Sequence, residues 1–147
     1  MENKLRIGFG SADITPPKGL AMSGGLDPRW NEGVHSPLTV NTIYAENSGN
    51  RMALAGIDLI GLHRELADEI LDTVSDKTGL ERDCILLCCS HTHSGPYLRQ
   101  RNHLEERVVD EKYVNALPDR IAESVQQAID SAQPAAMHLG RSLVYNV

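Results

Sequence analysis

Apolar and polar residues alternate in the first third of the chain in a way that is typical of strands. Residues 38–46 show this alternation and are expected to form a strand at or near a sheet edge, and the glycine-rich segment 5–12 is predicted to be the first strand. The Asn-Ser-Gly-Asn run at 47–50 is a turn, so a hairpin is predicted between 38–46 and a further strand at 52–59. Residues 13–17, Asp-Ile-Thr-Pro-Pro, predict a turn after the first strand.

Helical periodicity follows the predicted hairpin. Apolar residues recur every three or four positions between 63 and 77, which predicts a helix that Gly79 ends. A second helix is predicted over 111–132, kinked or split in two at Pro118, because proline removes a helix hydrogen bond. Residues 135–143 are expected to form a last strand.

The run Cys-Ile-Leu-Leu-Cys-Cys at 84–89 has almost no polar alternation. Such a run is typical of a strand buried on both faces, as in a parallel sheet. Together with the segment at 52–59 and the helix between them, it predicts a β-α-β unit with parallel strands. The chain is therefore expected to form one α/β domain over 1–147, with a mixed, largely parallel sheet and helices packed on it.

Two histidines follow this central strand directly. His91 and His93 precede a Gly-Pro stop, and in open α/β sheets ligands bind where strands end. Residues two apart on an extended chain point to the same side, so both imidazoles are expected to face one small volume. Neutral imidazole is a good ligand for zinc and similar metals. The alternative is that both side chains only make local hydrogen bonds.

Asp58 is an acid at the end of the apolar strand 52–59. Two interpretations stay open: it caps the following helix, or it is a metal ligand or a hydrogen-bond acceptor for a metal-binding histidine. If the strands at 52–59 and 84–89 are parallel, Asp58 and His91 lie at the same edge of the sheet and are expected to share a site.

Two segments without periodicity carry further candidates. The glycine- and proline-rich loop at 18–37 contains His35, and loops of this length are often functional. The charged segment at 97–110 contains Arg99 and Arg101. It is either a solvated loop or a flap whose arginines meet an acidic group of a substrate.

Composition narrows the classes of function. The net charge of −6 argues against nucleic acid or an anionic membrane as the main partner. No apolar run has the length of a transmembrane segment, and the N-terminus lacks a signal-peptide core. The three cysteines all lie on the predicted central strand and are expected to be buried thiols in a reducing compartment. A cytoplasmic protein is predicted.

The Gly-Phe-Gly at 8–10 is not a dinucleotide loop, because the third glycine is missing.

Four motifs occur together in one family. They are Gly-Ser-Ala-Asp-Ile-Thr-Pro-Pro at 10–17, Gly-Val-His-Ser-Pro-Leu at 33–38, Ile-Asp-Leu at 57–59 and Ser-His-Thr-His-Ser-Gly-Pro at 90–96. In this order they resemble the N-terminal domain of the neutral/alkaline non-lysosomal ceramidases. The resemblance covers nearly the whole chain, and the His-Thr-His-Ser-Gly-Pro run is its most specific part.

The resemblance implies a zinc-dependent amidase, in which metal-activated water attacks an amide of a small, lipid-like substrate. His91 matches the family's first zinc-ligand histidine. His93 matches the neighbouring histidine that assists catalysis, and His35 matches a histidine near the metal. Asp58 matches a recurring acid.

The family's remaining zinc ligands, a histidine, a glutamate and a tyrosine, come from later in the chain. Catalytic zinc needs three protein ligands and an open position. We therefore expect an incomplete catalytic unit, whose site is completed by a missing C-terminal portion or by another chain. The alternative is an inactive fragment or a partner-dependent module that self-associates. A hydrolase using Ser94 is disfavoured, since the Gly-x-Ser-x-Gly elbow is absent.

Overall fold

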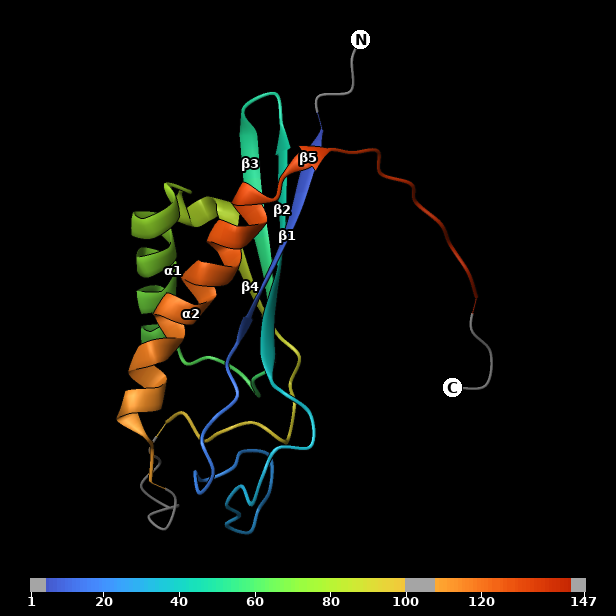
Figure 1. Cartoon of the computed structure of the whole chain (residues 1–147). Coiled ribbons are helices and arrows are strands. Elements are labelled where there is room, and N and C mark those ends of the chain that lie inside the picture. The colour runs from blue at the N-terminus through green and yellow to red at the C-terminus, as the bar shows by residue number, and fades with distance from the viewer. Residues whose placement is uncertain (1–4, 100–107, 144–147) are drawn as a thin grey trace.

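The computed structural model describes residues 5–99 and 108–143. These residues form one sheet with two long helices (Figure 1). In chain order the elements are β1 (Arg6–Asp13), β2 (Thr39–Asn47), β3 (Asn50–Ile57), α1 (Arg64–Thr78), a 3₁₀ turn (Arg82–Cys84), β4 (Ile85–Cys89), α2 (Glu111–Asp130) and β5 (Gln133–Pro134).

The sheet has the order β4-β3-β2-β1-β5. The α/β class and the mixed sheet are confirmed, and so is the parallel β3–β4 pair of the predicted β-α-β unit. The expectation of a largely parallel sheet is corrected, because the other three pairings among the described strands are antiparallel. The hairpin at 47–50 makes β2 and β3 antiparallel. After β1 the chain passes through the long loop at 18–37 and returns as β2, antiparallel to β1.

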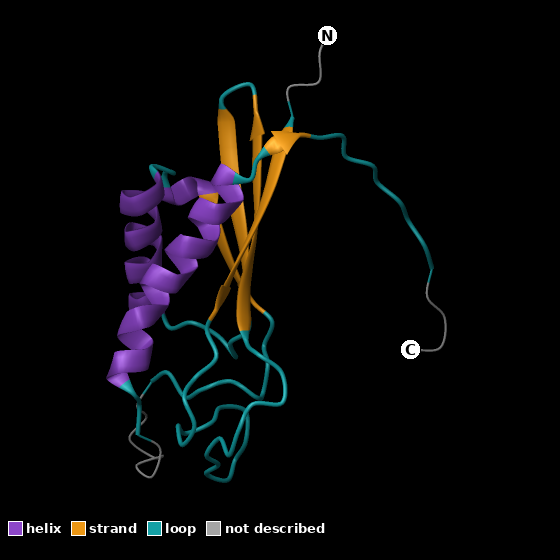
Figure 2. Cartoon of the chain, viewed as in Figure 1, coloured by secondary structure: helices purple, strands orange, loops and turns teal. Residues whose placement is uncertain are grey.

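Both helices lie on the same face of the sheet, and the other face is left bare (Figure 2). α2 packs against β1, β2 and α1. The inward side chains of the sheet and the apolar faces of the helices form one core, whose fully buried members include Val40, Ile57, Leu66, Ile70, Val74, Ile121 and Val125. Burying each such aliphatic side chain contributes roughly 1.5–3 kcal/mol to the free energy of folding.

Two glycines of β1 let α2 approach the sheet closely. A Cβ on Gly8 would lie 1.8 Å from the carbonyl oxygen of Ala128, and one on Gly10 would lie 2.0 Å from that of Ser124. The hydroxyl of Ser131 accepts from the Phe9 amide and donates to the Phe9 carbonyl, both at 2.8 Å. The Gly-Phe-Gly run therefore serves helix packing. Ser131, the C-cap residue of α2, bonds the backbone amide and carbonyl of Phe9, where the two-residue β5 no longer pairs with β1.

The positions of two strands differ from the sequence-based expectations. β2 is the central strand and not an edge strand, since it pairs with β1 on one side and β3 on the other. β4 was expected to be central and buried on both faces, but it lies at one edge of the sheet. Leu86 is 51% exposed on its uncovered face, and Cys88 beside it is also exposed. Cys84 and Cys89 are half-buried, so the prediction of three buried thiols is also wrong.

Two C-terminal expectations are also corrected. Helix α2 is not split at Pro118, which is buried within it and lies two turns after the cap at Asp110. The predicted strand at 135–143 does not form: only Gln133 and Pro134 pair with β1, and residues 136–143 are exposed. No helix in the described part of the chain is long and apolar enough to cross a membrane.

Candidate functional site

The loops that follow β1, β3 and β4 gather at one end of the sheet (Figure 2). Two backbone hydrogen bonds fasten the loop after β4 to the end of β3 and to the loop that follows it. They run from the Ser90 amide to the Ile57 carbonyl and from the His91 amide to the Leu59 carbonyl. The parallel β3–β4 pairing thus continues beyond the strand ends and fixes the position of the His-Thr-His run.

His91 has the best-defined geometry in this group of loops. Its backbone is left-handed, with φ of 59°, and its side chain is exposed. Its imidazole Nδ1 lies 2.7 Å from the carbonyl oxygen of Ile60. A carbonyl only accepts, so Nδ1 carries the proton and Nε2 is left as the acceptor nitrogen of the neutral ring. A hydrogen bond from one ring nitrogen to a backbone carbonyl is typical of metal-binding histidines.

His93 lies beside His91, with ring centroids 5.2 Å apart and an interplanar angle of 63°. The two rings are close as expected, but the cause is different. The chain turns sharply at His91 and does not continue as an extended strand. The loop at 18–37 contacts His93 at two residues. A Cβ on Gly24 would lie 2.4 Å from the Cβ of His93, and Arg29 donates a hydrogen bond to the His93 carbonyl at 3.0 Å.

The carboxylate of Asp58 is hydrogen-bonded to the first residue of β2. One of its carboxylate oxygens accepts from the Thr39 amide at 3.0 Å and from the Thr39 hydroxyl at 3.2 Å. The interpretation of Asp58 as a helix cap is wrong, because His63 caps α1 by accepting from the Leu66 amide. Asp58 is half-buried and joins the end of β3 to the start of β2.

A cavity of about 420 Å³ opens beside His91. His63 and Arg99 line it together with apolar residues, and the complete lining is Ser23, Ile60, Gly61, Leu62, His63, His91, Tyr97, Leu98 and Arg99. Arg99 therefore lines this cavity, and its contact with a group of a substrate stays a prediction. The backbone amide of Glu65, the neighbouring His63 and the charge of Arg99 lower the pKa of the Glu65 carboxyl.

Sequence reasoning missed His63 as a residue of this cavity. The available signal was its position directly before the apolar periodicity of α1, where a side chain that accepts a hydrogen bond is favoured. Tyr97 and Ser23 were missed as well. They are brought in by pairing between the loop at 18–37 and the one after β4, through bonds from the Ser23 amide to the Gly95 carbonyl and from the Tyr97 amide to the Ala21 carbonyl.

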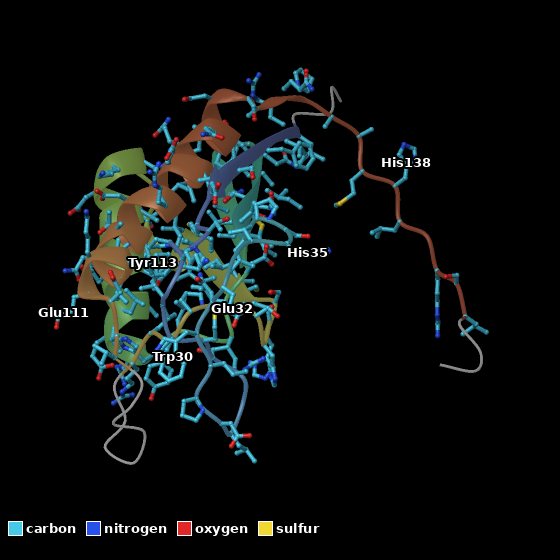
Figure 3. All side chains as sticks on the ribbon, turned by 60° about the horizontal axis from the view of Figure 1, so that its bottom comes forward. Trp30, Glu32, His35, Glu111, Tyr113 and His138 are labelled. Atoms are coloured by element: carbon cyan, nitrogen blue, oxygen red, sulfur yellow. The ribbon has the colours of Figure 1, made fainter. Side chains whose placement is uncertain are left out.

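His35 lines a different hollow, of about 590 Å³, which Thr92 and Ser94 also line. It is exposed, and its Nδ1 lies 3.1 Å from the Ser36 hydroxyl. Figure 3 shows His35 on the same loop as Trp30 and Glu32, which line that hollow too. The structure therefore does not place His35 in the cavity of His91. Arg101 lies outside the described residues.

The donors of this region do not form a complete metal-binding set. Within residues 5–99 and 108–143, no group of three or more His, Cys, Asp or Glu side chains is arranged to hold a metal ion. His91 and His93 are brought together, Asp58 is held by Thr39, and His35 lies apart. A catalytic zinc ion would require further donors than these.

Solved structures share this fold. One, described as "Crystal Structure Analysis of neutral ceramidase from Pseudomonas aeruginosa", matches with a TM-score of 0.79 and 25% sequence identity, over 91% of this chain and 23% of that chain. A second, described as "Ceramidase complexed with C2", matches with a TM-score of 0.79 and 26% identity, over 90% of this chain and 22% of that chain. No protein-family model and no curated protein matches the sequence.

The chain spans less than a quarter of the length of either ceramidase. Within that span the similarity extends over about nine-tenths of this chain. The resemblance to the neutral ceramidases that the sequence motifs indicated is thereby confirmed, and the partial coverage fits a likeness to an N-terminal portion of such a protein.

Proposed function

We propose that this chain supplies the histidine-bearing part of a zinc-dependent hydrolase that cleaves a linear N-acyl amide. The observation that carries the proposal is the Nδ1 hydrogen bond of His91 to Ile60, which leaves Nε2 as the ring nitrogen that could bind a metal. The similarity to neutral ceramidases supports the class of reaction.

The donor chemistry of His91 fits zinc, because a neutral imidazole with one anchored N–H is among the commonest zinc ligands. When bound, zinc would lower the pKa of a coordinated water and polarise the amide carbonyl. His91 provides one nitrogen. The remaining protein donors, in this proposal, come from residues outside the described part of the chain.

The other side chains have separate roles in this proposal. His93, exposed and in contact with the His91 ring, is positioned to hold or transfer a proton at its imidazole. Arg99 lines the cavity and would orient a polar or acidic group of the substrate. Asp58 keeps the ends of β2 and β3 together and so positions the loop that carries the Ile60 carbonyl. His35 is kept as a more distant candidate on the neighbouring hollow.

A second candidate function is a module without activity of its own, which needs another chain to complete the site. One observation favours it: residues 5–99 and 108–143 hold no set of three metal donors. In this alternative, weak zinc binding is retained but turnover is absent.

The test is elemental analysis and zinc titration of the purified chain, together with a His91→Ala variant. We expect zinc binding that falls at least ten-fold in His91→Ala. His138→Ala is the matched control, because His138 is exposed far from the site and its removal leaves zinc binding unchanged (Figure 3). Equal zinc binding in wild type and His91→Ala would remove the basis of the proposal. Turnover of simple N-acyl amides then separates the hydrolase from the partner-dependent module.

A further inference from the structure

The cavity beside His91 has a positively charged side chain in its lining. Its walls come from the loop at 18–37, from residues 60–63 before α1 and from residues 97–99 after β4. Its volume of about 420 Å³ lies within the range of small-molecule sites. Among the described residues that line it, Arg99 is the one side chain with a permanent charge, and none is acidic.

The guanidinium of Arg99 is available to a ligand. Arg99 is exposed, and in the described part of the chain it forms no ion pair. Its charge acts on the carboxylate of Glu65, which is 73% exposed and is not among the described residues that line the cavity. A guanidinium offers a planar pair of N–H donors that matches the two oxygens of a carboxylate.

His63 adds a second donor to the cavity. Its Nδ1 accepts from the Leu66 amide at 3.3 Å, so in the neutral ring the proton is on Nε2. The same Nδ1 lies 3.0 Å from a carboxylate oxygen of Glu65. When the ring is protonated, Nδ1–H donates to that oxygen and Nε2 keeps its proton. In both states Nε2–H is the ring donor that is left for a ligand in the cavity.

The balance of charge favours a ligand with a single negative charge. One guanidinium supplies one positive charge, and the nearby Glu65 carboxylate would repel the second charge of a phosphate group. His91 lines the same cavity, so a small molecule held by Arg99 also reaches the ring that is proposed to bind the metal. The lining contains three aliphatic side chains that suit the carbon atoms beside a carboxylate: Ile60, Leu62 and Leu98.

We propose that this cavity binds the carboxylate of an N-acyl amino acid through Arg99 and His63, and that such compounds are the amides which the hydrolase cleaves. The inference rests on the proposed function, because it places the scissile amide beside His91. In an N-acyl α-amino acid a single carbon atom separates the amide nitrogen from the carboxylate, so one cavity holds both groups. Hydrolysis breaks the amide C–N bond: the hydroxyl of water goes to the acyl carbon and its proton to the nitrogen, which releases a carboxylic acid and an amino acid.

The test is an NMR titration of the zinc-free chain with N-hexanoylglycine and with its uncharged analogue, N-hexanoylglycinamide. We expect N-hexanoylglycine to bind at least five-fold more tightly and to shift the amide signal of His63. Arg99→Gln should abolish this preference and, because Arg99 is exposed, leave the melting curve unchanged. Arg51→Gln is the matched control. Arg51 is exposed at the opposite end of β3, so this variant keeps the preference.

Two further variants test the neighbouring groups. Glu65→Gln removes a negative charge near Arg99, so we expect N-hexanoylglycine to bind more tightly. His63→Asn retains a side chain that caps the helix well but lacks the imidazole, so we expect weaker binding of N-hexanoylglycine at unchanged stability.

Equal binding of the two probes, or no binding of N-hexanoylglycine, would overturn this inference and leave zinc binding by His91 untouched. Hexanoate that binds as tightly as N-hexanoylglycine would also contradict it, because the cavity would then take the released acid and not the amino-acid part of the substrate. A chain that prefers N-hexanoylglycine but whose zinc binding does not change in His91→Ala would support the carboxylate site and refute the proposed hydrolase.

Discussion

The imidazole Nδ1 of His91 lies 2.7 Å from the carbonyl oxygen of Ile60. The two residues belong to loops that follow neighbouring parallel strands, so the sheet itself sets the orientation of the ring. We expect neutral His91 to be the Nδ1–H tautomer even without metal. Long-range ¹H–¹⁵N correlation spectra above pH 7 report this state directly. Exposed His138 provides the reference spectrum of an unconstrained ring, and an Nε2–H pattern at His91 would contradict the hydrogen bond.

Asp58 holds the start of β2 by accepting from both the amide and the hydroxyl of Thr39. Removing the acceptor in Asp58→Ala leaves a half-buried amide without its partner, so we expect a loss of about 1–3 kcal/mol in the free energy of unfolding, measured by urea denaturation. Thr39→Val removes only the hydroxyl bond and should cost less. If Asp58→Ala instead abolished zinc binding at unchanged stability, Asp58 would be a ligand and not a structural acceptor.

Gly24 contacts His93 so closely that no side chain fits between them. Its φ is +86°, and an added Cβ would lie 2.4 Å from the His93 ring carbon Cγ. Gly24→Ala therefore combines backbone strain with a clash, and we expect a loss of at least about 1 kcal/mol together with shifted His91 and His93 resonances. Gly33→Ala, on the same loop with open space around it, should change stability by less than about 0.5 kcal/mol. Equal effects of the two substitutions would argue against this contact.

Tyr113 fastens α2 to the turn after β1, its hydroxyl donating to the Ile14 carbonyl at 2.6 Å. Burial raises the pKa of this phenol well above its ordinary value of about 10. Because ionisation is disfavoured in the folded state, the stabilisation is complete below pH about 10 and is lost as the pH rises further. We expect the wild type to lose more unfolding free energy between pH 8 and 10.5 than Tyr113→Phe does. At pH 8 the variant should be about 1 kcal/mol less stable. Parallel pH profiles would show that Tyr113 does not cause the alkaline loss.

Local patterns in the sequence were sufficient for both helices, for β1 to β4 and for their order, but not for the C-terminal strand. Apolar spacing of three and four located α1, and Gly79 in a left-handed conformation ends it as predicted. The Asn-Ser-Gly-Asn turn produced the β2–β3 hairpin. The His-Thr-His-Ser-Gly-Pro run was located after a strand end, and its resemblance to the ceramidases was recognisable because short motifs are local in the chain.

Strand position and ring orientation depended on contacts between distant residues. The apolar run at 84–89 does not reveal whether the strand is buried on both faces or lies at an edge of the sheet with Leu86 exposed. Burial is decided by which other elements pack on the strand. Likewise, the close approach of α2 explains Gly8 and Gly10, and the Ile60 carbonyl orients the ring of His91. The sequence by itself determined which residues carry chemistry, whereas the tertiary structure decided which of them meet. Side-chain type is a local property, and proximity is a property of the whole fold.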